Sequence, residues 1–268
     1  MEMQELVFTA AVTCIARGAV LRDLVLGRIT GMRRRARQWT HPVSRHSIPS
    51  GKRELDAVLV RPFEQPRASL LICHGIGETV EYWTGVQHVL AYRGVASLVF
   101  DYSGYGRSRG RVDWRRCEED SVAAFEYLKA MRTGAPVSLL GFSMGSGIAT
   151  AILNRTDPQR LVLCAAFTSF RDAACSMGVP RNCAVALPAI WGGEAPLRAC
   201  GRPVLIVHGE RDRIFPLAMA QRLAQWAGPT AELVVAAGQK HNEPFQHPQL
   251  TFWGPVANWL TLVTQEPT

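Results

Sequence analysis

The sequence predicts an α/β fold in which a mostly parallel, eight-stranded sheet carries helices on both faces. Three observations support this prediction. Short apolar runs alternate with stretches of helical periodicity over residues 41–268. Several of these runs are continuous and rich in β-branched residues, as expected of strands that are buried on both faces. Several also end in a turn that contains glycine, where the functional residues of a parallel sheet gather.

The elements can be placed in order along the chain. Two strands are expected at 44–48 and 54–60, joined by a turn in which Gly51 permits a positive φ. Six further apolar runs predict strands at 69–73, 96–100, 137–140, 161–167, 204–207 and 231–235. Helical periodicity predicts helices at 118–131, from the turn after 140 to about 154, near 216–227, and from 248 to about 263. Residues 171–201 are irregular and mixed in character, and we interpret them as a short lid-like segment.

Length and composition favour one domain. The chain has 268 residues and 47% apolar content, which is enough for one large core. Its seven cysteines show no C-x-x-C pair and no metal-binding spacing, so we expect a reducing, cytoplasmic location, no disulfide framework and no metal. Cys73 and Cys164 fall in predicted strands and are interpreted as small buried hydrophobic residues.

The basic charge is concentrated near the amino terminus. Residues 1–53 hold ten Lys/Arg against three Asp/Glu, a balance of +7, while the rest of the chain holds twenty against nineteen. The body therefore gives no reason to expect nucleic-acid binding. The composition changes near residue 40, which predicts a basic N-terminal helical extension over 1–40 and a globular domain over 41–268.

Residues 5–38 of this extension form an apolar-rich helical stretch that ends in an arginine cluster. Three charged residues interrupt the apolar run and argue against a membrane span: Arg17, Arg22 and Asp23. Two acidic residues, Glu2 and Glu5, argue against a secretory signal. Three interpretations stay open: a helix packed on the body or on a second copy, a helix on the inner membrane surface that binds anionic headgroups, and a disordered basic tail.

The stretch Gly141-Phe142-Ser143-Met144-Gly145 has the form of a nucleophile elbow. It follows a short apolar strand and precedes a run of small residues suited to starting a helix. Such a turn pushes the Ser143 hydroxyl out of the sheet, and glycine two residues before and after avoids steric clashes. The helix that begins near Met144 directs backbone N–H groups, that of Met144 first, towards a developing oxyanion.

A serine nucleophile needs a base and an acid that orients the base. Asp212 and His241 follow two later strands, and the ends of parallel strands lie along one edge of the sheet. The order Ser143, Asp212, His241 is the one expected for a hydrolase of this architecture. Asp172 stays open as an alternative acid, with Glu210 as a lesser rival. His74 and His208 each begin a His-Gly turn and are interpreted as braces of those turns; Asp101 is interpreted as structural, with Arg107 as a partner.

Five motifs occur in one order along the chain: His74-Gly75-Ile76-Gly77-Glu78, Phe100-Asp101-Tyr102-Ser103-Gly104-Tyr105-Gly106-Arg107-Ser108, Gly141-Phe142-Ser143-Met144-Gly145, His208-Gly209-Glu210-Arg211-Asp212 and Lys240-His241-Asn242. Over roughly residues 42–265 the chain resembles the α/β-hydrolase superfamily, in its compact monoacylglycerol-lipase-like, Bem46-like and protein-depalmitoylase-like branch. The resemblance implies a second oxyanion donor, the backbone N–H of Ile76. It also implies an acyl-enzyme mechanism without a metal or cofactor.

The substrate is less constrained. A serine at position 143 excludes the dehalogenases and epoxide hydrolases of this fold, which use aspartate, and the dienelactone hydrolases, which use cysteine. A carboxylic ester is the first expectation, a thioester as in depalmitoylases the second, and a peptide the third. A slow-turnover binding protein stays open as a different class. Three aromatic residues are candidates for the wall of the substrate pocket: Trp83, Phe142 and Trp191.

Overall fold

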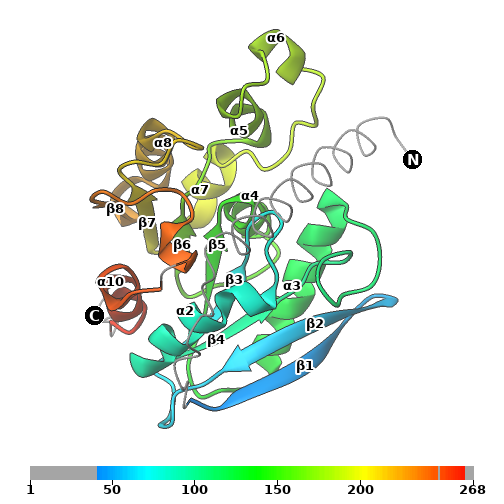
Figure 1. Cartoon of the computed structure of the whole chain (residues 1–268), viewed down its shortest axis with the longest axis vertical. Coiled ribbons are helices and arrows are strands. Elements are labelled where there is room, and N and C mark those ends of the chain that lie inside the picture. Colours follow the sequence, from blue (N-terminus) through cyan, green and yellow to red (C-terminus); the bar gives the residue numbers. More distant parts are fainter. Residues whose placement is uncertain (1–40, 247, 263–268) are drawn as a thin grey trace, which may run out of the picture.

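The computed structural model describes residues 41–246 and 248–262, so the expected extension at 1–40 lies outside the described residues. Within them, one sheet holds eight strands in the order β1-β2-β4-β3-β5-β6-β7-β8 (Figure 1). The strands are β1 Val43–Ser50, β2 Arg53–Val60, β3 Ala68–Cys73, β4 Val95–Phe100, β5 Val137–Phe142, β6 Leu161–Cys164, β7 Val204–Gly209 and β8 Ala231–Ala236.

The strand directions confirm the predicted mostly parallel sheet. β1 and β2 form an antiparallel hairpin, and β2 also pairs antiparallel with β4. From β4 to β8 every neighbouring pair is parallel. The hairpin turn contains Gly51 at a φ of 59°, a conformation that glycine adopts without the steric cost of a side chain. The carboxyl ends of the parallel strands therefore lie along one edge.

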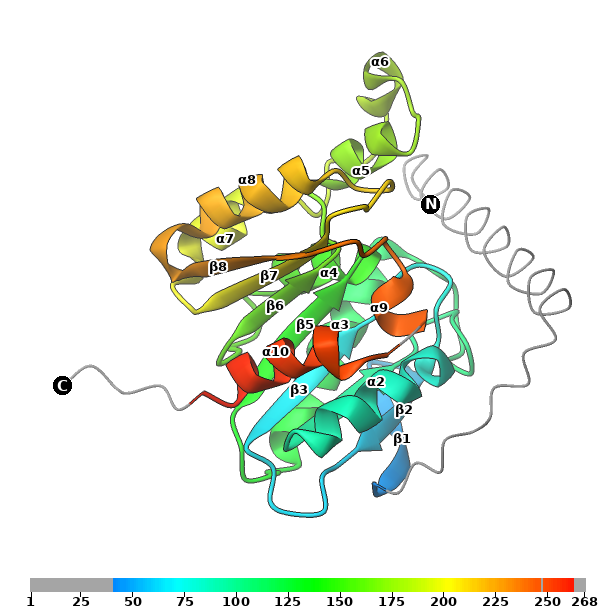
Figure 2. The ribbon, with the colours of Figure 1, turned by 60° about the vertical axis from the view of Figure 1, so that its left-hand side comes forward.

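Helices cover both faces of the sheet (Figure 2). On one face α3 (Trp114–Ala130), α4 (Met144–Ala151) and α8 (Leu217–Ala227) pack against a core that includes Phe100, Leu139 and Ile206. On the other face α2 (Val80–Tyr92) and α10 (Leu250–Leu260) cover a second core centred on Trp83 and Trp253. The strands β3 to β7 are buried on both faces, which explains their continuous apolar runs, whereas the edge strands β1 and β8 are partly exposed. Short helices η1 (Gly228–Thr230) and α9 (Glu243–Gln246) flank β8.

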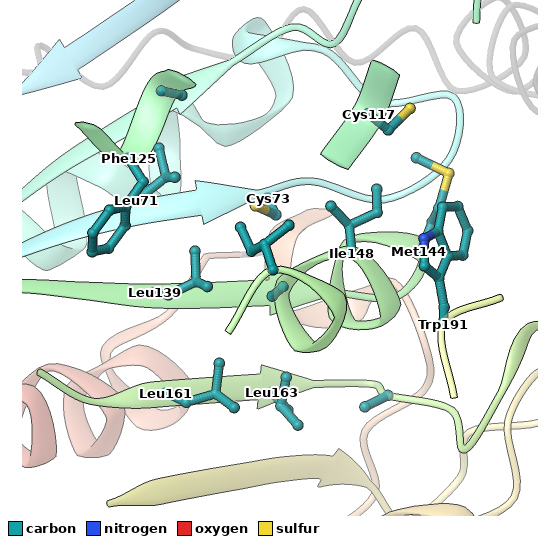
Figure 3. Close-up of a cluster of buried hydrophobic side chains, with 14 of the residues drawn as sticks. Leu71, Cys73, Cys117, Phe125, Leu139, Met144, Ile148, Leu161, Leu163 and Trp191 are labelled. Carbon is teal, nitrogen blue, oxygen red and sulfur yellow. The ribbon is translucent and has the colours of Figure 1, made fainter. Parts of the chain in front are cut away.

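The central strands contribute fully buried side chains to the first core. Figure 3 shows Leu71 and Cys73 of β3, Leu139 of β5 and Leu161 of β6 in one buried cluster with Ile148 of α4. All five side chains are fully buried. Burying one leucine or isoleucine contributes about 1.5–3 kcal/mol relative to leaving it exposed. This packing fixes the ends of β3 and β5, from which two of the expected site turns emerge.

Three differences from the sequence-based expectations have local causes. β6 ends at Cys164 and not at residue 167, because Ala165 takes a positive φ of 49° and turns the chain out of the sheet. The sequence analysis places no helix at 80–92, where the structure has α2. The segment 171–201 is not irregular, since it contains α5 (Phe170–Ser176), α6 (Arg181–Ala184) and α7 (Glu194–Cys200).

The described residues bear on two further expectations, one about cysteines and one about membrane-spanning helices. Their six cysteines are all free. None of their helices is both long and apolar enough to cross a membrane. The expected membrane-surface helix at 5–38 lies outside the described residues.

Candidate active site

Ser143 stands between β5 and α4, in the strained conformation that a nucleophile elbow requires. Its φ is 52° and its ψ is −118°, a region that costs a non-glycine residue about 1–3 kcal/mol. A Cβ atom at Gly141 would collide with the backbone of Gly145, and one at Gly145 would collide with the carbonyl of Cys73. Glycine at both positions therefore lets the turn pack closely against β3 and hold the serine in place.

The structure brings His241 to this serine. The Nε2 atom of His241, in the loop after β8, lies 2.9 Å from the Oγ atom of Ser143. Its Nδ1 atom lies 2.7 Å from Oδ2 of Asp212, which follows β7. Since a carboxylate only accepts hydrogen bonds, Nδ1–H is the donor to Asp212, and Nε2 is left to accept from the serine hydroxyl. All three side chains are more than nine-tenths buried.

Asp212 is held as an ionised acceptor. Burial favours its neutral form, but hydrogen bonds from His241 and from the backbone N–H groups of Phe215 and Ile214 outweigh that effect and lower its pKa below the ordinary value. The sequence left Asp172 as an alternative. Its carboxylate instead accepts hydrogen bonds from Thr168 and its neighbour Ser169, at the start of α5. The structure places Asp212, and not Asp172, beside the histidine.

The two rival histidines bond to backbone carbonyls. The Nδ1–H of His74 donates to the carbonyl of Gly75 at 2.8 Å, and burial lowers the pKa of His74 to about 4. The Nε2–H of His208 donates to the carbonyl of Phe215 at 2.9 Å, and burial lowers its pKa as well. Both imidazoles therefore stay neutral and hold turns of the chain.

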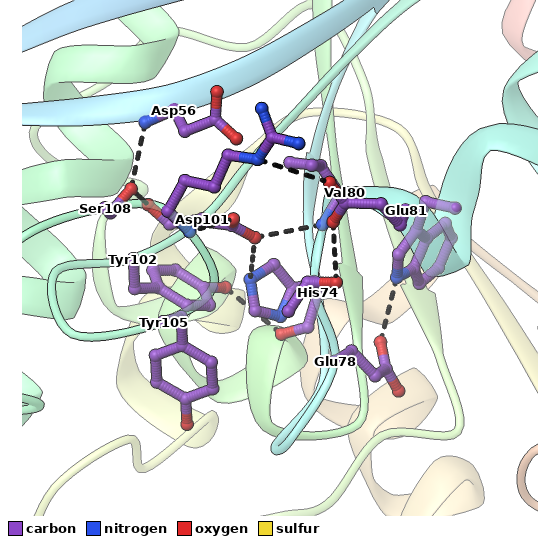
Figure 4. A network of polar contacts seen from close by, with 12 residues as sticks. Asp56, His74, Glu78, Val80, Glu81, Asp101, Tyr102, Tyr105 and Ser108 are labelled. Atoms are coloured by element: carbon purple, nitrogen blue, oxygen red, sulfur yellow. Dashed lines mark hydrogen bonds and ion pairs between the residues drawn. The ribbon is translucent and has the colours of Figure 1, made fainter. Parts of the chain in front are cut away.

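Asp101 occupies a similar place after β4. Its carboxylate accepts hydrogen bonds from the backbone N–H groups of Val80 and Arg107 (Figure 4). The partner is thus the main chain of Arg107 and not its guanidinium group. The Ser108 hydroxyl donates to the Asp101 carbonyl at 2.6 Å, which closes the loop onto β4. These contacts tie the loop after β4 to the start of α2.

The two expected oxyanion donors belong to two different turns, one after β3 and one after β5. The N–H of Met144 is at the first position of α4, where a helix has unpaired donors. The N–H of Ile76 lies in the turn after β3. No described residue accepts a hydrogen bond from either group. The Met144 side chain itself is buried, with its sulfur 3.8 Å from the Tyr105 hydroxyl.

The three aromatic pocket candidates lie in the core. Trp83 is fully buried, and its ring packs against Phe142 at 5.6 Å and Trp253 at 5.9 Å between centroids. Phe142 is also fully buried, with its ring 5.7 Å from that of His241. Trp191 is 4% exposed and donates its indole N–H to Glu118. All three side chains are therefore buried among other residues, and we assign none of them a substrate contact.

The two ends of the lid-like segment are joined by hydrogen bonds, and the side chains at its tip are exposed. Phe170 donates its N–H to the carbonyl of Ile190, and Gly193 donates to Thr168, so the two ends of the segment lie together. Figures 1 and 2 show α5 and α6 standing away from the sheet, beyond its carboxyl edge. The tip exposes Met177 by 48%. It also exposes Val185 by 66%.

Sequence reasoning gave no role to two residues at this edge, Glu78 and Tyr105. Both belong to motifs that it quoted, but their significance depends on burial and contacts that a motif does not reveal. Among the described residues, no group of three or more metal-binding side chains occurs. Two surface hollows of about 260 and 360 Å³ lie beside β8 and α7, and none of Ser143, Asp212 and His241 lines them.

Comparison with known proteins places the chain near several hydrolases. The family profile of the serine aminopeptidases, S33, matches residues 64–191. An uncharacterized protein of Mycobacterium tuberculosis is 28% identical over 182 residues, covering 66% of this chain and 63% of its own. The lysophosphatidylserine lipase ABHD12 of Danio rerio is 25% identical over 240 residues, covering 76% and 63%. The chain thus spans less than two thirds of the length of these relatives.

Solved structures share the fold at low sequence identity. The Pyrococcus furiosus esterase Pf2001 has a TM-score of 0.70 and 16% identity, covering 85% of this chain and 94% of its own. Est1E of Butyrivibrio proteoclasticus, solved with ferulic acid, has a TM-score of 0.66 and 21% identity, covering 81% and 96%. At these identities the likeness establishes the architecture alone.

Proposed function

Because this chain is a member of the α/β-hydrolase superfamily, we propose that it hydrolyses carboxylic esters through an acyl-enzyme on Ser143. The observation that carries the proposal is the continuous hydrogen-bonded line from the serine hydroxyl through His241 to Asp212. Each of the three side chains has the hydrogen-bonding partner that nucleophilic catalysis by serine needs.

The chemistry follows from these contacts. His241 Nε2 takes the hydroxyl proton as Ser143 Oγ attacks the ester carbonyl. The tetrahedral oxyanion is stabilised by the N–H groups of Ile76 and Met144, each contributing on the order of 3 kcal/mol at the transition state. Collapse expels the alcohol, which receives the proton from the imidazolium. Water then attacks the acyl-enzyme with His241 again as the base, which releases the acid and restores the serine.

Asp212 supports both steps by keeping the histidine in one tautomer. Its second carboxylate oxygen is occupied by two backbone N–H groups, so the carboxylate cannot rotate away from Nδ1. Its lowered pKa keeps it ionised, which stabilises the imidazolium that forms in each half-reaction. The proposed reaction uses only groups of this chain and water.

The proposed substrate is a small-molecule carboxylic ester, and a thioester is the alternative. Relatives and structural neighbours that carry the names lipase and esterase favour the ester. The name of the matched family, serine aminopeptidase, makes an amide the third arm of the test. Contact of the basic residues 5–38 with a membrane surface stays a proposal, to be tested by co-sedimentation with anionic and neutral vesicles.

The deciding experiment combines active-site labelling with a substrate panel. A fluorophosphonate probe should label the wild type and leave Ser143→Ala unlabelled. The panel compares p-nitrophenyl butyrate and palmitate, an acyl thioester and an aminoacyl anilide, with Ser143→Ala as the blank for each. Preference for either ester supports the proposal. Turnover of the anilide alone would indicate a peptidase and not an esterase. Labelling without turnover of any substrate would indicate a binding protein.

A further inference from the structure

Glu78 is a buried carboxyl at the turn that carries the expected oxyanion donor Ile76. The residue is 6% exposed. Its Oε2 atom accepts hydrogen bonds from the backbone N–H of Gly75 and from the indole N–H of Trp83, both at 2.8 Å. The Glu78 N–H returns to the carbonyl of Gly75 at 3.4 Å. Glu78 therefore binds Gly75 twice, through its carboxyl to the N–H and through its own backbone N–H to the carbonyl.

The fit at Gly75 shows how closely the carboxyl packs on the turn. A Cβ atom placed at Gly75 would lie 2.6 Å from Oε1 of Glu78. That is closer than real Cβ atoms approach an oxygen, so glycine is required here for the carboxyl to reach the backbone. Gly77, at a φ of 74°, completes the turn. The carboxyl of Glu78 thus holds the peptide between His74 and Gly75, the one that precedes the peptide carrying the Ile76 N–H.

Trp83 connects this carboxyl to the rigid core. Its ring is fixed between Phe142, which directly precedes the nucleophile, and Trp253 of α10. The indole N–H can therefore hold Glu78 at a constant distance from β5. This gives a contact path from the core, through Trp83 and Glu78, to the backbone of the oxyanion turn.

No described cation pairs with Glu78, which is unusual for a buried carboxylate. Burial raises its pKa to about 7, and the hydrogen bonds from Gly75 and Trp83 offset only part of that effect. The loop after β4 faces it with Tyr105, whose pKa is raised by burial and in part by the Glu78 charge. His74, in the same turn, is neutral at neutral pH. Figure 4 shows Glu78 and Tyr105 both below His74.

Other charged groups near this turn are engaged elsewhere. Asp101, after β4, accepts backbone hydrogen bonds from Val80 and Arg107. Glu81, in α2, pairs with Arg45 at the surface. Ser143 and His241 approach from β5 and β8 as the reacting pair. None of these supplies a positive charge to Glu78 at rest.

We propose that Glu78 is a positioning residue of the esterase reaction, holding the oxyanion turn through Gly75 and favouring the reaction in its neutral form. This inference rests on the proposed function. An uncharged carboxyl can accept both hydrogen bonds through its carbonyl oxygen and adds no charge beside the Ile76 N–H. An ionised carboxyl keeps both hydrogen bonds but places a negative charge about one peptide away from the forming oxyanion, where like charges repel.

Two substitutions separate the hydrogen bonds from the charge. Glu78→Gln keeps the shape and an oxygen that can accept both donors, but it cannot ionise. Glu78→Leu keeps the approximate volume and removes the acceptor. The matched control is Glu118→Gln, because Glu118 also accepts an indole N–H, from Trp191, but lies on α3. The measurement is kcat and KM for p-nitrophenyl butyrate from pH 5.5 to 8.5 with the full chain.

The expected results are specific to a positioning role. The activity ratio of Glu78→Gln to wild type should rise from about 1 at pH 5.5 to between about five and ten at pH 8.5. The same ratio for Glu118→Gln should not vary with pH. Glu78→Leu should lower kcat by about 10- to 100-fold with KM within about twofold, since the donor is misplaced only where the oxyanion forms.

Other outcomes overturn the inference. A pH-independent ratio for Glu78→Gln would remove the role of the charge, and unchanged kcat in Glu78→Leu would remove the positioning role. If Glu78→Leu does not fold, the Gln ratio alone decides. If the wild type turns over no ester, the proposed function fails separately, and the rate of fluorophosphonate labelling across the same variants and pH range tests Glu78. A wild type that neither turns over nor labels overturns both.

Discussion

The turns around Ser143 and the segment between Phe170 and Gly193 lie at the same edge of the sheet but are built differently. The nucleophile turn is buried, and Gly141 and Gly145 leave no space for any larger residue. The other segment is held by backbone hydrogen bonds at its base and exposes apolar side chains at its tip. The geometry of Ser143, Asp212 and His241 is therefore built separately from the exposed tip of this segment.

One side chain joins the two halves of the exposed segment by hydrogen bonds. Arg171 of α5 donates to the carbonyl of Leu187 through two of its nitrogens and to that of Val185 through one. The Ser176 hydroxyl donates to the carbonyl of Ile214, two residues after Asp212, at 2.5 Å, and Trp191 near the end of the segment lies against Gly147 of α4. Changes in the rigid turns should therefore alter kcat, and changes in the segment should alter substrate preference.

The largest expected effect comes from removing the nucleophile. Ser143→Ala should lower kcat for p-nitrophenyl butyrate by on the order of 10⁵-fold, since the hydroxyl is the atom that forms the acyl-enzyme. Stopped-flow and long-time-course assays measure this range. The thermal midpoint serves as the control and should not fall, because the substitution removes a strained serine without opening the core. Residual activity above one per cent of wild type would contradict the assignment.

The second effect distinguishes the two candidate acids. Asp212→Asn should lower kcat by about 10³- to 10⁴-fold, because an amide no longer holds the histidine in the required tautomer. Asp172→Asn is the matched control and should keep kcat within about threefold, since its partners are Thr168 and Ser169. The reverse ranking in a side-by-side assay would move the acid to the start of α5.

A third effect concerns stability within the rigid region. The folded pKa of Glu78, about 7, lies above its ordinary value of 4.5. The native state therefore binds a proton that the unfolded chain has released, and the stability gained below pH 4.5 is lost as pH rises to about 7. Glu78→Gln removes this penalty, so at pH 8 it should gain up to about 3 kcal/mol relative to its effect at pH 4.5.

Calorimetric scans at these two pH values test the expectation. A gain of this size corresponds to a rise in Tm of about 5–10 °C at pH 8, with little change at pH 4.5. Glu118→Gln again provides the comparison: burial raises the pKa of Glu118 too, but Arg155 offers that carboxylate a cation, so its gain at pH 8 should be smaller. Equal shifts in Tm at both pH values would show that Glu78 carries no titration penalty in the native state.

The smallest effect belongs to the exposed segment. Arg171→Gln removes the guanidinium contacts within it and should raise KM for p-nitrophenyl palmitate by about three- to tenfold while leaving kcat for the butyrate ester unchanged. The control is Arg198→Gln on α7, whose exposed pair with Glu194 is expected to contribute less than about 1 kcal/mol. A fall in butyrate kcat with Arg171→Gln would show that the two regions are coupled.

These differences also explain what could be predicted from the sequence. All eight strands were predicted, six from apolar runs with a marked end and the first two from the Gly51 turn that joins them. The helix α2 was not, since Thr84 and Gly85 interrupt its pattern and its helical conformation depends on Trp83 and Val86 packing into the core. Helices as short as α6 have too few residues for any period, so the segment between Phe170 and Gly193 appeared irregular.

The candidate site divides in the same way. Ser143, Asp212 and His241 follow strand ends in a recognisable order, and the structure places them within hydrogen-bonding distance of one another. The aromatic residues chosen for the pocket lie beside motifs in the sequence but point into the core, because side-chain direction depends on the packing of α2 and α10. The burial of Glu78 could not be predicted from the motif that contains it, since a glutamate after a glycine turn is ordinarily exposed.

The close packing of the nucleophile turn has a consequence for protein engineering. Any side chain larger than hydrogen at Gly141 or Gly145 meets main-chain atoms, which cannot move aside without unpairing β3 from β5. Random mutagenesis should therefore recover no functional clones with changes at these two positions. Residues 177–186, where most side chains are exposed, should tolerate saturation. A library restricted to that tip would vary its exposed side chains while every member kept the same packing around Ser143.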